Sequence, residues 1–417
     1  MSNPKVIIIG GGLAGLCCAR HLNARGISNL VLESSNRVGG RAQTDEVDGF
    51  LLDRGFQVLS TAYPEAQDVL DYTALQLSCF EPRALVRYRG KFHRFADPWR
   101  RPQHLLSTAL SPIASLGDKL RIARLKSLVC RTTLEEIYER PETTTLSRLK
   151  GLGFSEQIIE AFFRPFLSGV FLEPNLNTSS RKFEMVFRMF SRGDAALPAG
   201  GMGALANQLA DALPAGTLRT GARVANVQNN VIQLADGGVL KSSRVVIACD
   251  KPAADQLLGE PPVKEQSPHG VTCFYFAAKR PPVAEPILVL NGENTGVINS
   301  LCVPSQVAPS YAPSGESLIS VSVLGVIEPS QEERTRTAVR QQLQQWYGEQ
   351  VKSWKHLKTC PIRYALPAQP PPTLSPVKKP IHRNDNLFIC GDYLDIASIQ
   401  GAMVSGRRAG EAVADSL

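Results

Sequence analysis

The sequence has no long hydrophobic run. None of its apolar stretches reaches the roughly 18 residues that a membrane-spanning helix requires, although 43% of its 417 residues are hydrophobic. Its nine cysteines show no Cys-x-x-Cys spacing. This pattern predicts buried thiols in a reducing compartment, and neither a disulfide framework nor a metal site. The first predicted strand begins at Val6, which leaves no room for a signal peptide. These absences favour a cytoplasmic location.

Catalytic side chains are also hard to find. The six histidines form no evident motif, and we interpret the isolated His93 and His269 as structural. No recognisable nucleic-acid-binding module accompanies the net charge of +8, so no nucleic-acid partner is predicted. A chain of this length is too long for one compact core and suggests two domains.

A glycine-rich turn follows the first apolar run, Val6–Ile9. Gly10 permits a sharp turn, Gly12 lets a pyrophosphate approach the backbone, and Gly15 lets the following helix pack closely on the strand. The N-terminus of such a helix favours negative charge. The sequence therefore predicts a strand–helix–strand unit that binds a dinucleotide.

Two features after this turn agree with that prediction. The apolar run Leu30–Leu32 ends in Glu33, 18 residues after Gly15, where a ribose hydroxyl needs an acceptor. Gly39 and Gly40 then precede Arg41. Consecutive glycines let a loop run close to a cofactor, and a guanidinium can pair with a phosphate.

The C-terminal part adds a second half to the motif. Residues 386–392 form a predicted buried strand that ends in Gly391 and Asp392, and a predicted helix begins near Ser398. Gly401 and Ala402 lie at its start, where backbone N–H groups can face a polar ring edge or a phosphate. A simple NAD-binding domain has no reason to return at its C-terminus, so this pairing favours FAD over NAD.

These motifs resemble the flavoprotein superfamily of amine oxidases, protoporphyrinogen oxidases and carotenoid desaturases. The resemblance implies that Glu33 binds the adenosine ribose and that the loop of Gly39, Gly40 and Arg41 lies along the pyrophosphate and flavin. It implies that Asp392, after Gly391, contacts the ribityl–phosphate region. No Cys or His lies in an evident attachment motif, so we expect non-covalent FAD.

Three further positions follow from the same resemblance. The helix N-terminus formed by Ile399, Gly401 and Ala402 is expected to face the pyrimidine end of the flavin. The residue matching Val224 is expected to offer backbone groups to adenine. Ser35 stands where many members of the superfamily have Arg, which alters the expected contacts to the adenosine half.

The expected fold is α/β, with a Rossmann-type FAD-binding domain and an interleaved α+β substrate domain. We assign residues 1–80, 195–265 and 381–417 to the FAD-binding domain and residues 81–194 and 266–380 to the substrate-binding domain. Within these, the patterns predict hairpins over 84–95 and 222–234, a strong helix near 330–347, and a largely helical stretch over 105–190 that residues 164–171 interrupt. The proline-rich residues 365–380 are predicted to form an extended connection.

Basic residues are concentrated in one segment. Residues 83–131 hold twelve Lys or Arg and two acidic residues, and leucines alternate with the basic residues around 105–128. One interpretation is a basic amphipathic patch on anionic lipid, which would make the protein peripheral to the membrane. The other is a solvated helix face over a core. Both stay open, as does the oligomeric state.

The reaction is inferred by comparison within the superfamily. Amine oxidases usually carry a Lys in a strand of the substrate domain, and Thr272 is the best match here. They also place an aromatic residue before the C-terminal Gly-Ala pair, where this chain has Ile399 and Gln400. Both differences weigh against a simple amine substrate, and the C-terminal Ser-x-x-Gly-Ala-x-x-Ser-Gly form resembles carotenoid desaturases.

The sequence therefore predicts an FAD-dependent oxidoreductase that dehydrogenates an apolar polyene- or tetrapyrrole-like small molecule by hydride transfer to flavin N5. The alternatives are a flavin amine oxidase and a flavin-dependent isomerase with no net redox change. The substrate, the electron acceptor and the catalytic side chains are not identified from the sequence.

Overall fold

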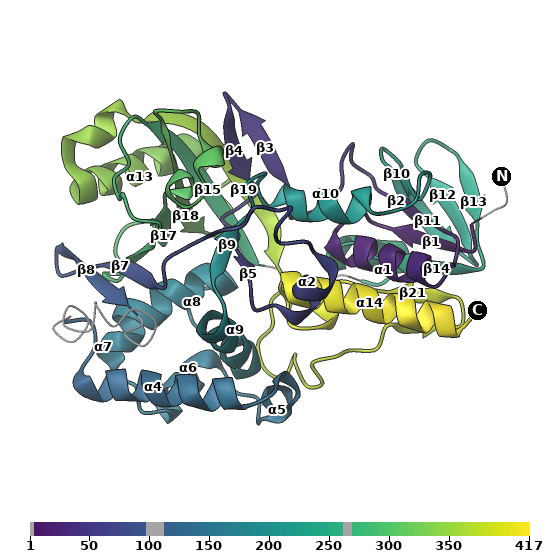
Figure 1. Cartoon of the computed structure of the whole chain (residues 1–417), viewed down its shortest axis with the longest axis horizontal. Helices are drawn as coiled ribbons and strands as arrows, with labels where there is room; N and C mark the ends of the chain where they lie inside the picture. Colours follow the sequence, from purple (N-terminus) through teal and green to yellow (C-terminus); the bar gives the residue numbers. More distant parts are fainter. Residues whose placement is uncertain (1–3, 97–111, 262–268) are drawn as a thin grey trace.

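The computed structural model describes residues 4–96, 112–261 and 269–417. Within them, two large sheets and a layer of helices form three regions (Figure 1). A six-stranded sheet lies with the N- and C-terminal segments at the right of Figure 1, a seven-stranded sheet lies at the upper left, and helices α4 to α9 lie at the lower left.

The six-stranded sheet is built from apolar runs far apart in the sequence. In spatial order its strands are β10 (Leu218–Arg219), β2 (Asn29–Leu32), β1 (Val6–Ile9), β14 (Arg244–Ile247), β21 (Leu387–Ile389) and β20 (His382–Asn384). All pair in parallel except β20, which is antiparallel to β21. The side chains of β1 are buried on both faces, as expected for a parallel strand covered by helices. The predicted α/β fold is confirmed.

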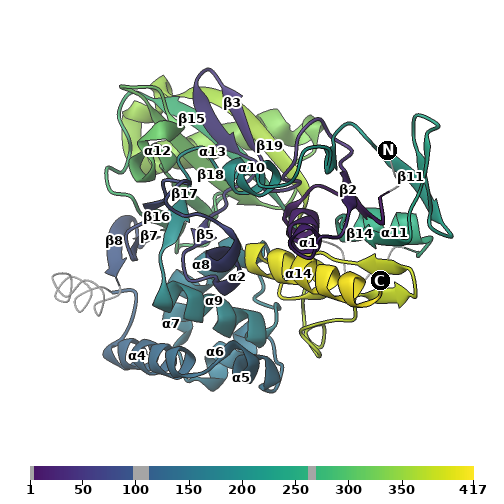
Figure 2. The same ribbon diagram turned by 45° about the vertical axis from the view of Figure 1, so that its right-hand side comes forward.

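Two helices from opposite ends of the chain cover this sheet side by side. Helix α1 (Leu13–Ala24) follows β1, and helix α14 (Ile399–Asp415) follows the last strand (Figures 1 and 2). Glycine makes their close approach possible, because an added Cβ at Gly406 would lie 2.1 Å from the carbonyl oxygen of Ala14. A Cβ at Gly410 would lie 3.0 Å from Cβ of His21.

The seven-stranded sheet joins two separate parts of the sequence. Its order is β19 (Lys355–Leu366), β15 (His269–Ala278), β18 (Ser317–Leu324), β17 (Ser300–Cys302), β16 (Leu288–Asn291), β7 (Arg83–Tyr88) and β8 (Lys91–Ala96). Strands β7 and β8 form the predicted hairpin, and its two turn residues, Arg89 and Gly90, have φ angles of 51° and 72°. Helix α13 (Glu332–Tyr347), also predicted, packs on one face of this sheet.

Short helices make up the third region. They are α4 (Leu116–Arg131), α5 (Leu134–Glu139), α6 (Thr145–Gly151), α7 (Glu156–Ile158), α8 (Arg164–Phe171) and α9 (Ser180–Arg192). The prediction that residues 164–171 interrupt the helices is wrong. A π-helical turn over Ile159–Phe163 leads directly into α8, so the helical chain continues through Pro165. No helix of the described residues is long and apolar enough to cross a membrane.

Smaller elements connect these regions. They are β3 (Thr44–Val47), β4 (Phe50–Asp53), β5 (Leu59–Ser60), β6 (Ser78–Cys79), β9 (Ala195–Leu197), β11 (Val224–Gln228), β12 (Val231–Leu234), β13 (Val239–Lys241), α2 (Pro64–Val69), α10 (Gly203–Asp211), α11 (Lys251–Leu258) and α12 (Pro304–Val307). The hairpin predicted over 222–234 is present as β11 and β12.

The proline-rich connection differs from its prediction. Residues 367–381 contain neither helix nor strand, but turns bend them, so the segment is not extended. Leu374 is fully buried, and its carbonyl accepts a hydrogen bond of 2.6 Å from Arg181, so the segment folds back onto α9.

The contact between α1 and α14 generates a test of stability. We expect Gly406→Ala to lower the free energy of unfolding by about 1–3 kcal/mol, because the new methyl group has no room against Ala14. Gly151→Ala is the matched control, since a Cβ there meets nothing within 4 Å. Urea unfolding followed by circular dichroism measures both, and equal midpoints for the two variants would contradict the packing argument.

Candidate functional site

In the first glycine turn, Gly10 and Gly15 are packed tightly against backbone atoms, whereas Gly12 is open. Gly10 has φ of +117°, and a Cβ there would lie 2.8 Å from the carbonyl oxygen of Ala248. A Cβ at Gly15 would lie 2.0 Å from the carbonyl oxygen of Gly10, so the helix packs as closely as predicted. A Cβ at Gly12 would meet nothing within 4 Å. The turn therefore leaves its backbone accessible at Gly12, where α1 begins without a side-chain cap.

A second glycine turn lies directly against the first. The amide of Gly39 donates to the carbonyl oxygen of Gly11 at 2.9 Å, and Gly12 and Gly39 form an isolated parallel bridge. A Cβ at Gly40 would lie 3.6 Å from Cα of Gly12. The structure thus brings together the two glycine motifs that the sequence predicted to border one ligand.

Glu33 lies at the end of β2, beneath the first turn. Its carboxylate is buried and accepts hydrogen bonds of 2.8 Å from the amides of Gly11 and Ser35. Its backbone carbonyl accepts from the amide of Ala222, which leads into β11 at Val224. Glu33, Ser35 and the start of β11 therefore lie in one region, as the assignment of an adenosine-binding half requires.

Arg41 differs from its sequence interpretation. Its guanidinium makes a bidentate ion pair with Asp392, at 2.8 Å and 2.6 Å, instead of standing free for a phosphate. Burial alone would lower the pKa of Arg41, but the charge of Asp392 and the hydrogen bond to it raise the pKa above its ordinary value. The two residues come from opposite ends of the chain, so this ion pair joins the loop of the second glycine turn to the C-terminal segment. The amide of the adjacent Gly391 donates to Oγ of Ser405 at 3.0 Å.

The start of α14 also differs in detail. We expected the amides of Gly401 and Ala402 to face a ligand. Instead, the amide of Gly401 donates to Oγ of Ser398 at 3.0 Å, and that of Ala402 donates to the carbonyl oxygen of Ser398 at 2.9 Å. A serine cap satisfies these donors within the helix. Gly401 is needed for packing, since a Cβ there would lie 2.0 Å from the carbonyl oxygen of Ile396.

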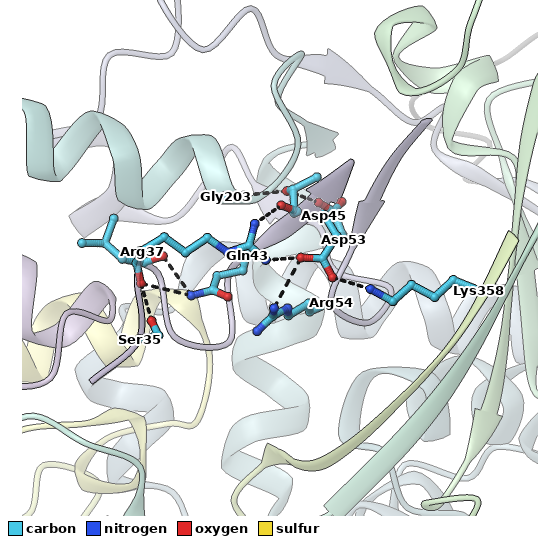
Figure 3. Close-up of polar contacts among 10 residues, drawn as sticks. Ser35, Arg37, Gln43, Asp45, Asp53, Arg54, Gly203 and Lys358 are labelled. Carbon is cyan, nitrogen blue, oxygen red and sulfur yellow. Dashed lines mark hydrogen bonds and ion pairs between the residues drawn. The ribbon is translucent and has the colours of Figure 1, made fainter. Parts of the chain in front are cut away.

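A buried carboxylate fixes the loop after the second turn. Asp53 accepts hydrogen bonds from Thr44 at 2.6 Å, from the amide of Met202 at 2.8 Å and from the hydroxyl of Tyr311 at 2.8 Å. Burial raises the pKa of Asp53 to about 6, although these hydrogen bonds act to lower it. The hydroxyl oxygen of Thr44 also accepts a hydrogen bond from the amide of Gly203. Thr44 and Asp53 together therefore hold the start of α10 against the segment after the second glycine turn (Figure 3).

A surface cluster continues this network. The carboxylate of Asp45 pairs with Arg37, with Arg54 and, at 2.7 Å, with Lys358 of the seven-stranded sheet (Figure 3). Burial acts to raise the pKa of Asp45, but the hydrogen bonds from Lys358 and Arg37 lower it well below its usual range. Asp45 thereby links the glycine loop to β19.

One face of strand β15 belongs to the buried cluster that also contains side chains of α1 and α14. Val271 and Cys273 belong to the same buried cluster as Leu13 of α1 and Met403 of α14. Phe274 belongs to the cluster under α13 on the opposite face. Because side chains alternate along a strand, Thr272 shares the face of Phe274.

The match of Thr272 to the amine-oxidase lysine therefore fails. Its hydroxyl donates to the carbonyl oxygen of Gly325 at 3.0 Å and accepts from the amide of Ile327 at 2.9 Å. Those bonds tie it to backbone on the side of β15 away from the glycine motifs. Neighbouring Val271 and Cys273 carry no lysine amine, so β15 supplies none to this side.

Sequence reasoning missed Lys182. This side chain on α9 is only 2% exposed, and its electrostatic neighbours include Asp392 and Arg41. A signal was available, because Lys182 shares a helical stripe with Met185, Val186 and Met189, all of which are buried. A lysine on the apolar stripe of a helix is a candidate for a functional residue.

The arrangement fits a bound dinucleotide. The backbone is open at Gly12, the N-terminus of α1 carries no side-chain cap, and the carboxylate of Glu33 lies at the end of the neighbouring strand. Carboxylate oxygens can accept several hydrogen bonds, so Glu33 can take ribose hydroxyls while holding two amides. No group of three or more His, Cys, Asp or Glu side chains suited to a metal ion occurs in the part of the chain that the structure describes.

Comparisons with known proteins agree with this geometry. A family model described as flavin containing amine oxidoreductase matches residues 13–414. Protoporphyrinogen oxidase 2 of Arabidopsis thaliana is 23% identical over 169 residues, which are 40% of this chain and 33% of that protein. The matched part thus spans a third of the length of that relative.

Solved structures share the fold along the whole chain. An oxidoreductase from Methanosarcina mazei has a TM-score of 0.74 and 18% identity, covering 98% of this chain and 100% of its own. Cyclohexylamine oxidase from Brevibacterium oxydans has a TM-score of 0.70 and 17% identity, covering 99% of each chain. At such identities the likeness establishes the fold alone.

Proposed function

This chain belongs to the family of flavin-containing amine oxidoreductases, and we propose that it binds FAD non-covalently and dehydrogenates an apolar, polyene- or tetrapyrrole-like small molecule. The observation that carries the substrate class is the apolar face of β15. Val271, Cys273 and Tyr275 belong to one buried cluster with Leu13 and Met403, and Ile399 packs against this cluster. Such a surface suits an apolar ligand, and Ile399 and Gln400 stand where amine oxidases of the superfamily place an aromatic residue.

The proposed FAD site joins the N- and C-terminal segments. Its residues are Gly10, Gly12, Gly15, Glu33, Ser35, Gly39, Gly40, Arg41, Val224, Gly391, Asp392, Ile399, Gly401 and Ala402. Contact between the two glycine turns and the buried position of Glu33 support the dinucleotide half. The Arg41–Asp392 pair supports the flavin half, because it holds the C-terminal segment against the second glycine turn.

The domain assignment is part of the same proposal. The FAD-binding domain comprises residues 1–80, 195–265 and 381–417, and the substrate-binding domain comprises residues 81–194 and 266–380. In its support, β1, β14 and β21 belong to one sheet, while β7 and β15 belong to the other.

When bound, FAD supplies the hydride acceptor of the reaction. The chain's own residues then have three tasks. The glycine turns and Glu33 hold the cofactor, the Arg41–Asp392 pair fixes the loop beside it, and the apolar face of β15 orients the substrate and excludes water.

Anaerobic reduction of the bound flavin tests the proposed reaction. We expect the visible flavin absorbance to bleach when a carotene in detergent or protoporphyrinogen is added, because the apolar wall accepts either molecule. A panel of amines is the comparison. Bleaching by amines alone would replace the proposal with amine oxidation, and a bound flavin that no compound reduces would favour an isomerase without net redox change.

A second proposal concerns the basic segment over residues 83–131, of which 97–111 lie outside the described residues. Helix α4 presents Leu116 and Leu120, which are 72% and 73% exposed, on the same face as the exposed Arg124. Its opposite face buries Leu125 and Val129. Exposed leucines beside arginines suit peripheral contact with an anionic membrane.

Co-sedimentation with vesicles measures this contact. We expect binding to vesicles rich in phosphatidylglycerol and loss of most of it in the variant Leu116→Ser/Leu120→Ser, because less apolar area is then buried in the bilayer. Val239→Ser is the control, since Val239 is 57% exposed outside this segment. Equal binding of the two variants would exclude α4 as the contact.

A further inference from the structure

Lys182 is buried without an acceptor for its amine. It is the third residue of α9 after the capping residue Ser179, and only 2% of its surface is exposed. Its Nζ lies over the ring of Phe171, 5.5 Å from the ring centroid. Among the described residues, no hydrogen bond or ion pair of Nζ is found. A buried ammonium in this state is costly, so the site favours the neutral amine or an added ligand.

The nearby acids are already engaged by other partners. Asp392 is held by Arg41. The carboxylate of Glu173 accepts hydrogen bonds from the amides of Asn175 at 2.8 Å and Thr178 at 3.0 Å. Neither acid is therefore placed as a dedicated partner for Lys182.

His269 contacts the backbone of Phe171. Its Nδ1 is 2.8 Å from the carbonyl oxygen of Phe171. Burial lowers the pKa of His269, and the hydrogen bond to Phe171 acts in the opposite direction. His269 thus belongs to the same cluster and must be tested beside Lys182.

The electrostatics of the cluster favour a neutral amine. Burial lowers the pKa of Lys182 to about 7, Asp392 and Glu173 act to raise it, and Arg41 acts to lower it. The N-terminal turn of α9 also disfavours positive charge at Lys182. Near neutral pH a large fraction of this amine carries a free lone pair, which is the state that a proton acceptor needs.

We propose that Lys182, buried against the ring of Phe171, is the proton acceptor of the dehydrogenation and that its amine reaches the reacting end of the bound flavin. This proposal rests on the proposed function. Strand β15 supplies no lysine to the site, and Thr272, the match to the amine-oxidase lysine, faces away from it. The proposal therefore assigns the amine to α9.

A substrate that gains a double bond loses one hydride and one proton. The hydride, with its electron pair, leaves to the oxidised flavin, which is the oxidant. The proton of the adjacent C–H or N–H bond passes to the lone pair of Nζ and gives an ammonium, and the electrons of that bond form the new double bond.

The first experiment needs no substrate. The visible spectrum of the FAD-loaded protein is recorded between pH 5.5 and 9. We expect a spectral transition with an apparent pKa near 7, because a charge that appears beside the flavin shifts its absorbance. We expect this transition to be absent in Lys182→Met and preserved in Lys150→Met, whose exposed lysine lies on α6.

The outcomes separate the two residues and the two proposals. A transition that persists in Lys182→Met and vanishes in His269→Gln would overturn the assignment and give the titration to the histidine. No transition in the wild-type holoprotein would also overturn it. Failure to bind FAD would contradict the proposed function itself.

The second experiment uses whichever substrate bleaches the flavin. We expect the rate of anaerobic flavin reduction to rise with pH through about 7 in the wild type. In Lys182→Met we expect a rate roughly 100-fold lower with no such rise, since a positioned proton acceptor typically contributes at least this factor. A Lys182→Met variant that keeps the wild-type pH profile would overturn the proposal.

Discussion

The ion pair between Arg41 and Asp392 is the constraint on which the site depends. It joins a loop near the N-terminus to the turn after β21 near the C-terminus, with two hydrogen bonds of 2.8 Å and 2.6 Å. Loss of Arg41 would leave the carboxylate of Asp392, whose side chain is only 4% exposed, as an uncompensated buried charge, which is strongly destabilising. The pair therefore holds the two halves of the proposed flavin site in register, and the tight packing of α14 on α1 at Gly406 supports the same junction.

Around this junction, polar and apolar contacts are divided between the two large sheets. The six-stranded sheet contributes the glycine turn and the carboxylate of Glu33, which suit a charged dinucleotide. The seven-stranded sheet contributes Val271 and Cys273, which suit an apolar ligand. Lys182 of α9 is buried against Phe171, and Asp392 and Arg41 are among its electrostatic neighbours.

Local features were predictable from the sequence, because short-range patterns determine them. The strand β1, the glycine turn after it and the hairpin at Arg89 and Gly90 follow from residue type and spacing alone. Non-local features were not predictable in this way. The choice of Asp392 as partner of Arg41 depends on how segments 351 residues apart pack together.

Thr272 and Lys182 show that the sequence also left the orientation of side chains within a single strand or helix undetermined. A one-residue difference in alignment moves a strand residue to the opposite face, and no signal within β15 fixed which face meets the site. The stripe of Lys182 with Met185 and Met189 was visible in the sequence, but the burial of Lys182 depends on how α9 packs with other segments, which include Phe171 and the distant Leu374.

Titration of the apoprotein with FAD, followed by flavin fluorescence, tests the central claim that both ends of the chain form one site. The account predicts one FAD per chain and no comparable binding of NAD. It also predicts that Glu33→Gln and Asp392→Asn each weaken FAD binding about 10- to 100-fold, because each loses a hydrogen bond to a charged group. Circular dichroism of the two apoproteins verifies their folding. Wild-type affinity for FAD in a folded Asp392→Asn variant would contradict the account.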